Sequence, residues 1–306
     1  MNIDNNAPIG SLALPDYSGT WTAIITPFKE DETLDETAFR KLIRRQIQNG
    51  VTGIVPVGTT GESPTTTADE DYRIFKIATE EASGEIRVMV GTGSNCTKDA
   101  IKYTENAKKT GADCCLVVSP YYNKPTQSGM LAHYKAIADV GLPVIVYNIK
   151  GRTSINIKTD TLMEMANHEM IVGVKEASGD LEQMEAVIEN RPNQFSVLSG
   201  DDGLTLSLIK MGGHGVVSVS SNVAPDQVSK MVNYALNGNF EEAEKLNDHL
   251  ENMFKDLFVE TNPIPVKYVL SQMGLCSPTF RMPLCTPSVD AKKILDELII
   301  RYQLNE

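Results

Sequence analysis

A lysine at the end of a short apolar run has the type and position best suited to chemistry in this sequence. Residues 171–179 read I-V-G-V-K-E-A-S-G, so β-branched residues lead directly into Lys175. A short apolar run bounded by turn residues predicts a buried strand, and lysine is almost never buried without a partner or a function. Strand alternation predicts that Ile171, Gly173 and Lys175 share one face, with Gly173 leaving space beneath the lysine.

Burial would make this lysine a nucleophile. Desolvation disfavours the ammonium and lowers the pKa of the amine, and a neutral amine attacks carbonyl carbons. At the ordinary lysine pKa of about 10.4, roughly one amine in 2,500 is neutral at pH 7, and a pKa of about 7–8 would raise that fraction by orders of magnitude. The alternative interpretation is a lysine at a strand end whose ammonium reaches solvent.

Other polar side chains follow apolar runs at matching points. Tyr147 lies near the end of the run at 143–148, and the loop G-T-T-G-E-S at 58–63 carries Thr59 and Thr60. A phenol beside an amine can transfer protons during imine chemistry, and hydroxyl and backbone N–H groups can bind a small carboxylate. Taken singly, the tyrosine could be a rim aromatic and G-T-T-G a tight loop. Their arrangement at one edge of a sheet favours a site.

A regular alternation of apolar runs and helical patterns would position these residues. Eight runs predict strands at 20–26, 53–57, 87–90, 114–118, 143–148, 171–175, 195–199 and 212–219. Thr67 and Glu70 form a capping-box pattern at the start of one intervening helix, and Thr97 is expected to cap another. Strict alternation predicts a parallel sheet, and eight units in about 220 residues predict a (β/α)8 TIM barrel over residues 17–238. The structural alternative is an open doubly wound sheet, although no G-x-G-x-x-G follows the first run.

The two ends of the chain differ from the barrel region. Residues 1–16 form a polar leader without the basic and apolar segments of a signal peptide. Residues 239–306 have no strand pattern and predict a small C-terminal helical domain, with one helix starting at Asn262-Pro263 and another at 289–303. We interpret this domain as an appendage and not as a second catalytic unit.

Composition limits the classes of function. The 306 residues carry a formal net charge of −12, which argues against nucleic acid and anionic membranes as partners. Five cysteines without C-x-x-C spacing and four histidines without H-x-x-x-H spacing indicate neither a disulfide framework nor a metal site. We expect reduced, mostly buried thiols in a cytoplasmic protein, and no run approaches the roughly 20 apolar residues of a membrane span.

Seven motifs together resemble the pyruvate-dependent class I aldolases, a family that includes N-acetylneuraminate lyase and dihydrodipicolinate synthase. They are G-T-T-G-E-S (58–63), P-Y-Y-N-K-P (120–125), Y-N-I-K-G-R-T (147–153), G-V-K-E-A-S-G (173–179), L-S-G-D-D (198–202), G-G-H-G-V-V-S-V (212–219) and N-P-I-P-V-K (262–267). The resemblance covers residues 17–305. The pair Thr59-Thr60 and the presence of Arg152 make it closer to the synthase than to the lyase.

The resemblance implies catalytic roles for Lys175, Tyr147, Thr59 and Tyr122. Lys175 would form a Schiff base with pyruvate, and Tyr147 would donate and accept protons. Thr59 and Tyr122 would complete a proton relay, with Tyr122 contributed by a neighbouring subunit of a homotetramer. No metal or organic cofactor is implied, because the lysine itself supplies the electron sink.

Substrate-binding roles are implied for Thr60, Val217, Arg152 and Gly200. Thr60 and the Val217 backbone would hold pyruvate, and Arg152 would bind the carboxylate of L-aspartate 4-semialdehyde, which suits a planar guanidinium. The implied reaction condenses the two substrates to 4-hydroxy-tetrahydrodipicolinate, the first committed step toward diaminopimelate and lysine. The alternatives are another pyruvate aldolase, acting on a sialic acid or a 2-keto-3-deoxy sugar acid, and a non-catalytic metabolite-binding barrel.

Some positions depart from the family pattern. Lys150 and Ser154 flank Arg152 where the family usually has proline and glycine. Lysine-inhibited members bind the amino acid in a cleft between subunits, and matching positions here include Ser63, Asp71, Asn95, Asp99 and Tyr121. Ala68 and Asp71 stand where the well-known bacterial pattern has histidines, so we expect inhibition by L-lysine that is retained but retuned.

Overall fold

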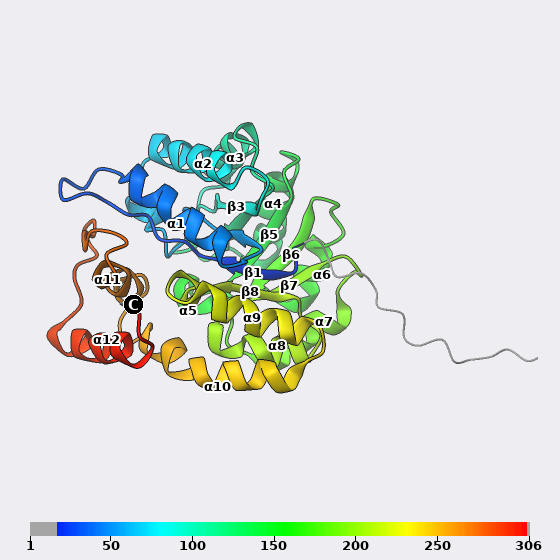
Figure 1. The fold of residues 1–306 in the computed structure, drawn as a ribbon. Helices are drawn as coiled ribbons and strands as arrows, with labels where there is room; N and C mark the ends of the chain where they lie inside the picture. The colour runs from blue at the N-terminus through cyan, green and yellow to red at the C-terminus, as the bar shows by residue number, and fades with distance from the viewer. Residues whose placement is uncertain (1–16, 305–306) are drawn as a thin grey trace, which may run out of the picture.

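The computed structural model describes residues 17–304, and these residues form a closed barrel of parallel strands, which confirms the predicted TIM barrel (Figure 1). The strands are β1 (Gly19–Thr22), β2 (Gly53–Ile54), β3 (Arg87–Gly91), β4 (Cys114–Val118), β5 (Val144–Asn148), β6 (Ile171–Glu176), β7 (Ser196–Ser199) and β8 (Gly215–Ser218). Each strand pairs in parallel with its neighbours in the sequence, and β8 pairs with β1. Closure therefore brings the carboxyl ends of all the strands to one rim, where a TIM barrel carries its site.

Helices follow the strands and cover the barrel from outside. They are α1 (Glu36–Gln48), α2 (Ala68–Ala82), α3 (Thr97–Lys109), α4 (Gln127–Ala138), α5 (Lys150–Thr153), α6 (Thr159–Met165), α7 (Leu181–Asn190), α8 (Thr205–Lys210) and α9 (Pro225–Leu236). Three short 3₁₀ helices, η1 (Ser63–Thr65), η2 (Asp202–Leu204) and η3 (Ser220–Asn222), lie in loops that follow strands. The four-residue α5 is not visible in the sequence pattern, and it carries Arg152.

One of the two expected helix caps is present. At the start of α2 the Glu70 N–H donates to Thr67 Oγ1 and the Thr67 N–H donates to the Glu70 carboxylate, so the capping box is confirmed. The expected cap at Thr97 is wrong. Thr97 is the first residue of α3, Cys96 precedes it without a side-chain cap, and the Thr97 hydroxyl lies 2.9 Å from His133 Nδ1 instead.

Apolar side chains form two separate layers. The barrel interior contains Trp21, Met89, Leu116, Ile145, Leu198 and Val217. A larger layer fills the space between the outer faces of the strands and the surrounding helices. Because successive residues of a strand point to opposite faces, buried strands of this kind read as continuous apolar runs.

The alternation predicted for β6 is wrong at its first residue. The pairing with β5 steps from Val144–Ile171 to Ile145–Gly173, so β6 has one extra residue at this point. Such a bulge reverses the direction of the side chains that precede it. Ile171 therefore packs in the outer layer, while Gly173 and Lys175 share the inner face as predicted.

The C-terminal part of the chain forms α10 (Phe240–Asp256), α11 (Ile264–Gln272) and α12 (Val289–Arg301). Helix α10 packs along α9, and α11 packs on α12 (Figure 1). The segment between α10 and α11 returns to the strand-end rim, where Phe258 and Asn262 line a cavity. The appendage thus reaches the candidate site. The polar leader at 1–16 lies outside the described residues.

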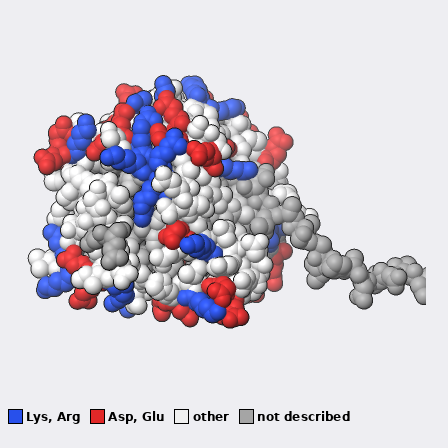
Figure 2. All heavy atoms as spheres, viewed as in Figure 1, with Lys and Arg blue, Asp and Glu red and all other residues white. Residues whose placement is uncertain are grey.

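Charged side chains of both signs are intermixed on the surface. Figure 2 shows this pattern over α1 and α2, where Arg40 and Arg44 pair with Glu81 at 2.9 and 2.5 Å. Within residues 17–304, no helix has the length and apolar character needed to cross a membrane.

The thiols are less buried than expected. Cys114 and Cys115 on β4 are buried, and Cys276 is half-buried. Cys96 and Cys285 are exposed, so the expectation of mostly buried thiols is only partly right. All five are free cysteines.

Candidate active site

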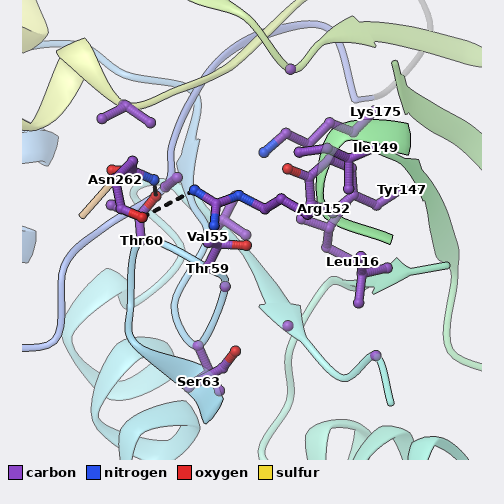
Figure 3. Close-up of a pocket in the computed structure, with 18 of the residues that line it drawn as sticks. Val55, Thr59, Thr60, Ser63, Leu116, Tyr147, Ile149, Arg152, Lys175 and Asn262 are labelled. Carbon is purple, nitrogen blue, oxygen red and sulfur yellow. Dashed lines mark hydrogen bonds between the residues drawn. The ribbon is translucent and has the colours of Figure 1, made fainter. Parts of the chain in front are cut away.

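A cavity of about 100 Å³ opens at the carboxyl ends of the strands (Figure 3). It is lined by residues that the sequence singled out, namely Thr59, Thr60, Tyr147, Arg152, Lys175 and Gly200. It is also lined by Ser63, Val219, Phe258 and Asn262, among others. The fold therefore brings together side chains that are up to about two hundred residues apart in the sequence.

Lys175 lies at the end of β6 and points into this cavity, with 6% of its surface exposed. Burial lowers the pKa of its amine to about 7, Asp202 raises it, and Arg152 lowers it further. Lys175 forms no salt bridge with another described residue. About half of the amines are therefore neutral near pH 7, which is the state that attacks a carbonyl.

Two glycines shape the surroundings of Lys175, but not as the sequence predicted. A Cβ on Gly200 would lie 3.0 Å from Lys175 Cε, so this glycine gives the lysine chain its room. The space at Gly173 is instead filled by neighbours, because a Cβ there would lie 2.9 Å from Ile145 Cδ1 and 2.6 Å from the Ser196 carbonyl oxygen. Gly173 thus permits close packing of the barrel interior beneath the lysine.

Tyr147 stands beside Lys175 on the neighbouring strand. The two residues are direct partners in the β5–β6 register, and Lys175 Nζ lies 4.2 Å from the centroid of the Tyr147 ring. Burial raises the pKa of the Tyr147 phenol to about 12, with Arg152 acting in the opposite direction. The phenol therefore holds its proton at neutral pH and can donate it.

Asp202 is a buried carboxylate whose role the sequence did not reveal. It is 2% exposed, and its Oδ2 accepts hydrogen bonds from the Val219 N–H, the Ser220 N–H and the Ser220 hydroxyl, each at 3.0 Å. These bonds join the loop after β7 to the end of β8, next to the cavity-lining Val219. Only the G-D-D motif after the seventh run could have drawn attention to this position.

The two candidate carboxylate-binding side chains meet at Asn262. Asn262 Nδ2 donates to Thr60 Oγ1 at 3.0 Å, and Arg152 Nη2 donates to the Asn262 carbonyl oxygen at 3.0 Å. In Figure 3 the Arg152 guanidinium extends from the side of Lys175 and Tyr147 toward Thr60 and Asn262. Sequence reasoning missed Asn262, because an asparagine before proline was taken only as the start of a helix.

A fully buried ion pair lies directly behind the G-T-T-G-E-S loop. Lys267 Nζ is 2.5 Å from Glu62 Oε1, and both side chains are 0% exposed. The Lys267 ammonium also lies 4.3 Å from the centroid of the Phe28 ring and 5.2 Å from that of Phe280. Burial lowers the pKa of Lys267, and Glu62 opposes this effect. The pair joins the loop that carries Thr59 and Thr60 to α11.

Two predicted residues do not line the cavity in a single chain. Tyr122 is 92% exposed, with a backbone φ of 72°, so its side chain projects away from the described residues. Val217 is 1% exposed and packs in the barrel interior, while Val219, two residues later, lines the cavity.

A second cavity of about 340 Å³ adjoins the first and shares Thr59, Ser63 and Arg152 with it. Asp71 and Tyr121 line it, whereas Asn95 and Asp99 do not. Asp71 is 8% exposed, and burial raises the pKa of its carboxyl to about 6, although Thr66 Oγ1 donates to it at 2.6 Å. The predicted lysine cleft is thus only partly assembled here by one chain.

The described residues contain no group of three or more His, Cys, Asp or Glu side chains arranged to hold a metal ion. The chemistry available from the site is that of an amine, a phenol, hydroxyls and a guanidinium.

The chain as a whole is similar to known proteins. The Dihydrodipicolinate synthetase family model matches residues 16–301. The 4-hydroxy-tetrahydrodipicolinate synthase of Endomicrobium trichonymphae is 49% identical over 271 residues, which span 88% of this chain and 92% of that one. A crystal structure of the dihydrodipicolinate synthase from Aquifex aeolicus is similar with a TM-score of 0.93 and 42% identity, covering 94% of this chain and 99% of that one. The structure of the synthase from Cyanidioschyzon merolae with lysine bound is similar with a TM-score of 0.91 and 39% identity, covering 94% of this chain and 99% of that one.

Proposed function

The chain belongs to the dihydrodipicolinate synthetase family, and from this premise we propose that it condenses pyruvate with L-aspartate 4-semialdehyde to give 4-hydroxy-tetrahydrodipicolinate. This would be the first committed step toward diaminopimelate and lysine. The observation that supports the proposal most strongly is Lys175, a buried amine with a pKa of about 7 that opens into a cavity beside Tyr147.

The first half of the reaction would join pyruvate to Lys175. The neutral Nζ attacks the C2 carbonyl of pyruvate to form a carbinolamine, which loses water to become an imine. The imine nitrogen then withdraws electrons, a C3 proton leaves, and an enamine forms. In the second half, C3 of the enamine attacks the aldehyde carbon of the second substrate, which restores the imine to Lys175 and leaves a hydroxyl on the former aldehyde carbon. The amino group of the second substrate then attacks C2 of this imine, and the C2–Nζ bond breaks, so the ring closes and Lys175 leaves as the free amine.

Tyr147 would supply and remove the protons of these steps. Its phenol is protonated at neutral pH and lies beside the lysine, so it can protonate the departing hydroxyl of the carbinolamine. Thr59 would pass the proton on to Tyr122. Because Tyr122 is 92% exposed on its own chain, we assign it to the site of a neighbouring subunit in a homotetramer.

The substrate carboxylates would be bound by separate groups. Thr60, with the backbone around Val217, would hold the carboxylate of pyruvate. Arg152 would bind the carboxylate of L-aspartate 4-semialdehyde through its planar guanidinium. Gly200 would contribute by leaving room for Lys175 and its adduct, because a Cβ there would lie 3.0 Å from Lys175 Cε. Lys150 begins the short α5 and Ser154 directly follows its last residue, and the contact between Arg152 and Asn262 supports the proposed placement of Arg152.

We further propose that free L-lysine binds in the second cavity at the contact between two subunits. Ser63, Asp71 and Tyr121 would face it there, with Asn95 and Asp99 completing the site in the assembled protein. The buried Asp71 carboxyl would attract the ammonium of the lysine side chain in place of a histidine. The similar synthase of Cyanidioschyzon merolae has a structure with lysine bound, which supports lysine as a ligand, while the residues that line the cavity suggest where it would bind. Activity should fall as L-lysine rises in the wild type and respond less in Asp71→Ala and Asp99→Ala; a flat wild-type curve would reject the proposal.

Borohydride trapping followed by an aldehyde assay tests the main proposal. Incubation with pyruvate and borohydride should add a lactyl-type mass to the protein, and turnover should then require L-aspartate 4-semialdehyde. The protein could also be trapped with pyruvate, fail to turn over this aldehyde, and cleave a sialic acid or a 2-keto-3-deoxy sugar acid. That result would reject L-aspartate 4-semialdehyde as the second substrate. Absence of trapping would reject imine chemistry altogether.

A further inference from the structure

Asn262 touches both side chains to which carboxylate binding is assigned. It comes from the segment between α10 and α11 and is only 5% exposed. Its side-chain Nδ2 donates to Thr60 Oγ1, and its backbone carbonyl accepts from Arg152 Nη2, each at 3.0 Å (Figure 3). A single residue of the C-terminal segment therefore joins the two halves of the site.

The direction of the hydrogen bond to Thr60 has a chemical consequence. A threonine hydroxyl has one hydrogen to donate and two lone pairs that accept. Since the Asn262 amide donates, Thr60 Oγ1 is the acceptor in this contact, and its own hydrogen remains available. Thr60 is 3% exposed and lines the cavity that contains Lys175. A carboxylate bound in that cavity can accept the free hydrogen.

The position of Asn262 is fixed by a second contact between the same two segments. Glu62 lies two residues after Thr60, and Lys267 lies five residues after Asn262. Their side chains form the fully buried ion pair at 2.5 Å. The hydrogen bond between Asn262 and Thr60 and the ion pair between Lys267 and Glu62 together hold the loop against the start of α11. The Asn262 amide is therefore kept in a fixed orientation toward Thr60.

We propose that Asn262 is a positioning residue for pyruvate, whose amide orients the Thr60 hydroxyl so that its hydrogen is directed to the pyruvate carboxylate. This inference rests on the proposed function. Because the side chain contacts Thr60 and only the backbone contacts Arg152, changes to the side chain act on pyruvate more than on the aldehyde.

Replacement by aspartate and by alanine separates positioning from packing. Asn262→Asp keeps the shape of the side chain but cannot donate, so it takes the Thr60 hydrogen and leaves none for pyruvate. We expect the KM for pyruvate to rise by about 10- to 100-fold in Asn262→Asp and by about 3- to 10-fold in Asn262→Ala, with the KM for the aldehyde changed less than about threefold in either. A purely structural role predicts the opposite order, with aspartate nearly normal and alanine the worst.

Two controls make the outcome specific. Asn237→Asp adds the same charge at an exposed position at the end of α9 and should leave both KM values unchanged. In a Thr60→Val background the Asn262→Asp effect on pyruvate should largely disappear, whereas an effect that persists would mean simple charge repulsion and would overturn the inference. Pyruvate trapping by the wild type is measured first: its failure rejects the proposed function, whereas normal trapping and an unaltered pyruvate KM in Asn262→Asp reject only the role of Asn262.

Discussion

Two lysines are buried in this protein, and their surroundings differ in one respect. Lys175 is 6% exposed and Lys267 is 0% exposed, and each ammonium lies over an aromatic ring, at 4.2 Å for Tyr147 and 4.3 Å for Phe28. Burial lowers the pKa of both. Lys267 has a carboxylate partner at 2.5 Å, whereas Lys175 forms no salt bridge with another described residue. The carboxylate partner, and not the burial, therefore distinguishes Lys267 from Lys175, the lysine to which we assign imine formation.

The two lysines are expected to affect the free energy of unfolding in different ways. The pKa of Lys175 is about 7 in the folded protein against 10.5 for an exposed lysine, so the unfolded chain binds more protons between these pH values. Stability due to this group therefore rises with pH from about 7 to 10.5, and at pH 7 its burial costs roughly 4–5 kcal/mol. A buried pair such as Lys267–Glu62 has little net effect while intact, but losing one partner leaves an uncompensated charge.

The largest expected effect is the loss of activity in Lys175→Ala. Turnover should fall by several orders of magnitude, because the nucleophile is removed while the barrel remains. In the wild type, pyruvate and borohydride should label a peptide containing Lys175 and leave Lys267 unmodified, as peptide mass spectrometry can show. Labelling of Lys267, or of any other lysine in place of Lys175, would contradict the assignment of imine formation to Lys175.

Tyr147→Phe makes the ring at Lys175 chemically like the Phe28 ring at Lys267. The aromatic face that contacts the ammonium remains, but the proton donor is lost. We expect kcat to fall by about 10²–10⁴-fold, with a much smaller change in the affinity for pyruvate. Steady-state kinetics measure both quantities, and a drop of less than about tenfold in kcat would contradict the assigned role.

Lys267→Met should affect stability first. It leaves Glu62 buried without a counter-charge, which is expected to lower the free energy of unfolding by about 3–5 kcal/mol. The double variant with Glu62→Leu should recover much of this loss in a denaturant titration, since both charges are then removed. Lys175→Met is the matched comparison and should be neutral or stabilising. If Lys267→Met and Lys175→Met lowered the free energy of unfolding equally, the ion pair with Glu62 would not distinguish the two lysines.

The smallest expected effect is the change in the rate of imine formation with pH. With a pKa of about 7, the neutral fraction of Lys175 rises roughly tenfold between pH 6 and pH 8 and then levels off. The rate of pyruvate trapping at low pyruvate should follow this curve. A rise of roughly one hundredfold over the same interval, continuing toward pH 10, would indicate an ordinary lysine instead.

Most of the fold could be predicted because its signals are local. Eight apolar runs with helical patterns between them define a barrel, and closure then places the ends of all the strands at one rim. Lys175 and Tyr147 are predictable for the same reason, since each lies at the end of its run. The bulge at Ile171 could not be predicted, because the run before Lys175 has no polar residue to mark the face that changes.

The remaining parts of the site depend on contacts that are distant in the sequence. Asn262 and Thr60 are 202 residues apart, and Lys267 and Glu62 are 205 apart. A charged residue on an expected surface helix gives no local sign that it will be buried against a loop from the other end of the chain. For Tyr122 the sequence suggests more than the single chain shows. A motif predicts a role for it, but the folded chain leaves its side chain exposed.

The separation of 205 residues between Glu62 and Lys267 also orders events during protein synthesis. At about 5–20 residues per second, Glu62 is made roughly 10–40 s before the lysine that neutralises it. Late in this interval the nascent chain contains every strand of the barrel and Lys175, yet the loop to which we assign pyruvate binding still lacks Asn262 and a counter-charge for Glu62. The late arrival of α11 thus delays a competent site until the barrel behind it is complete.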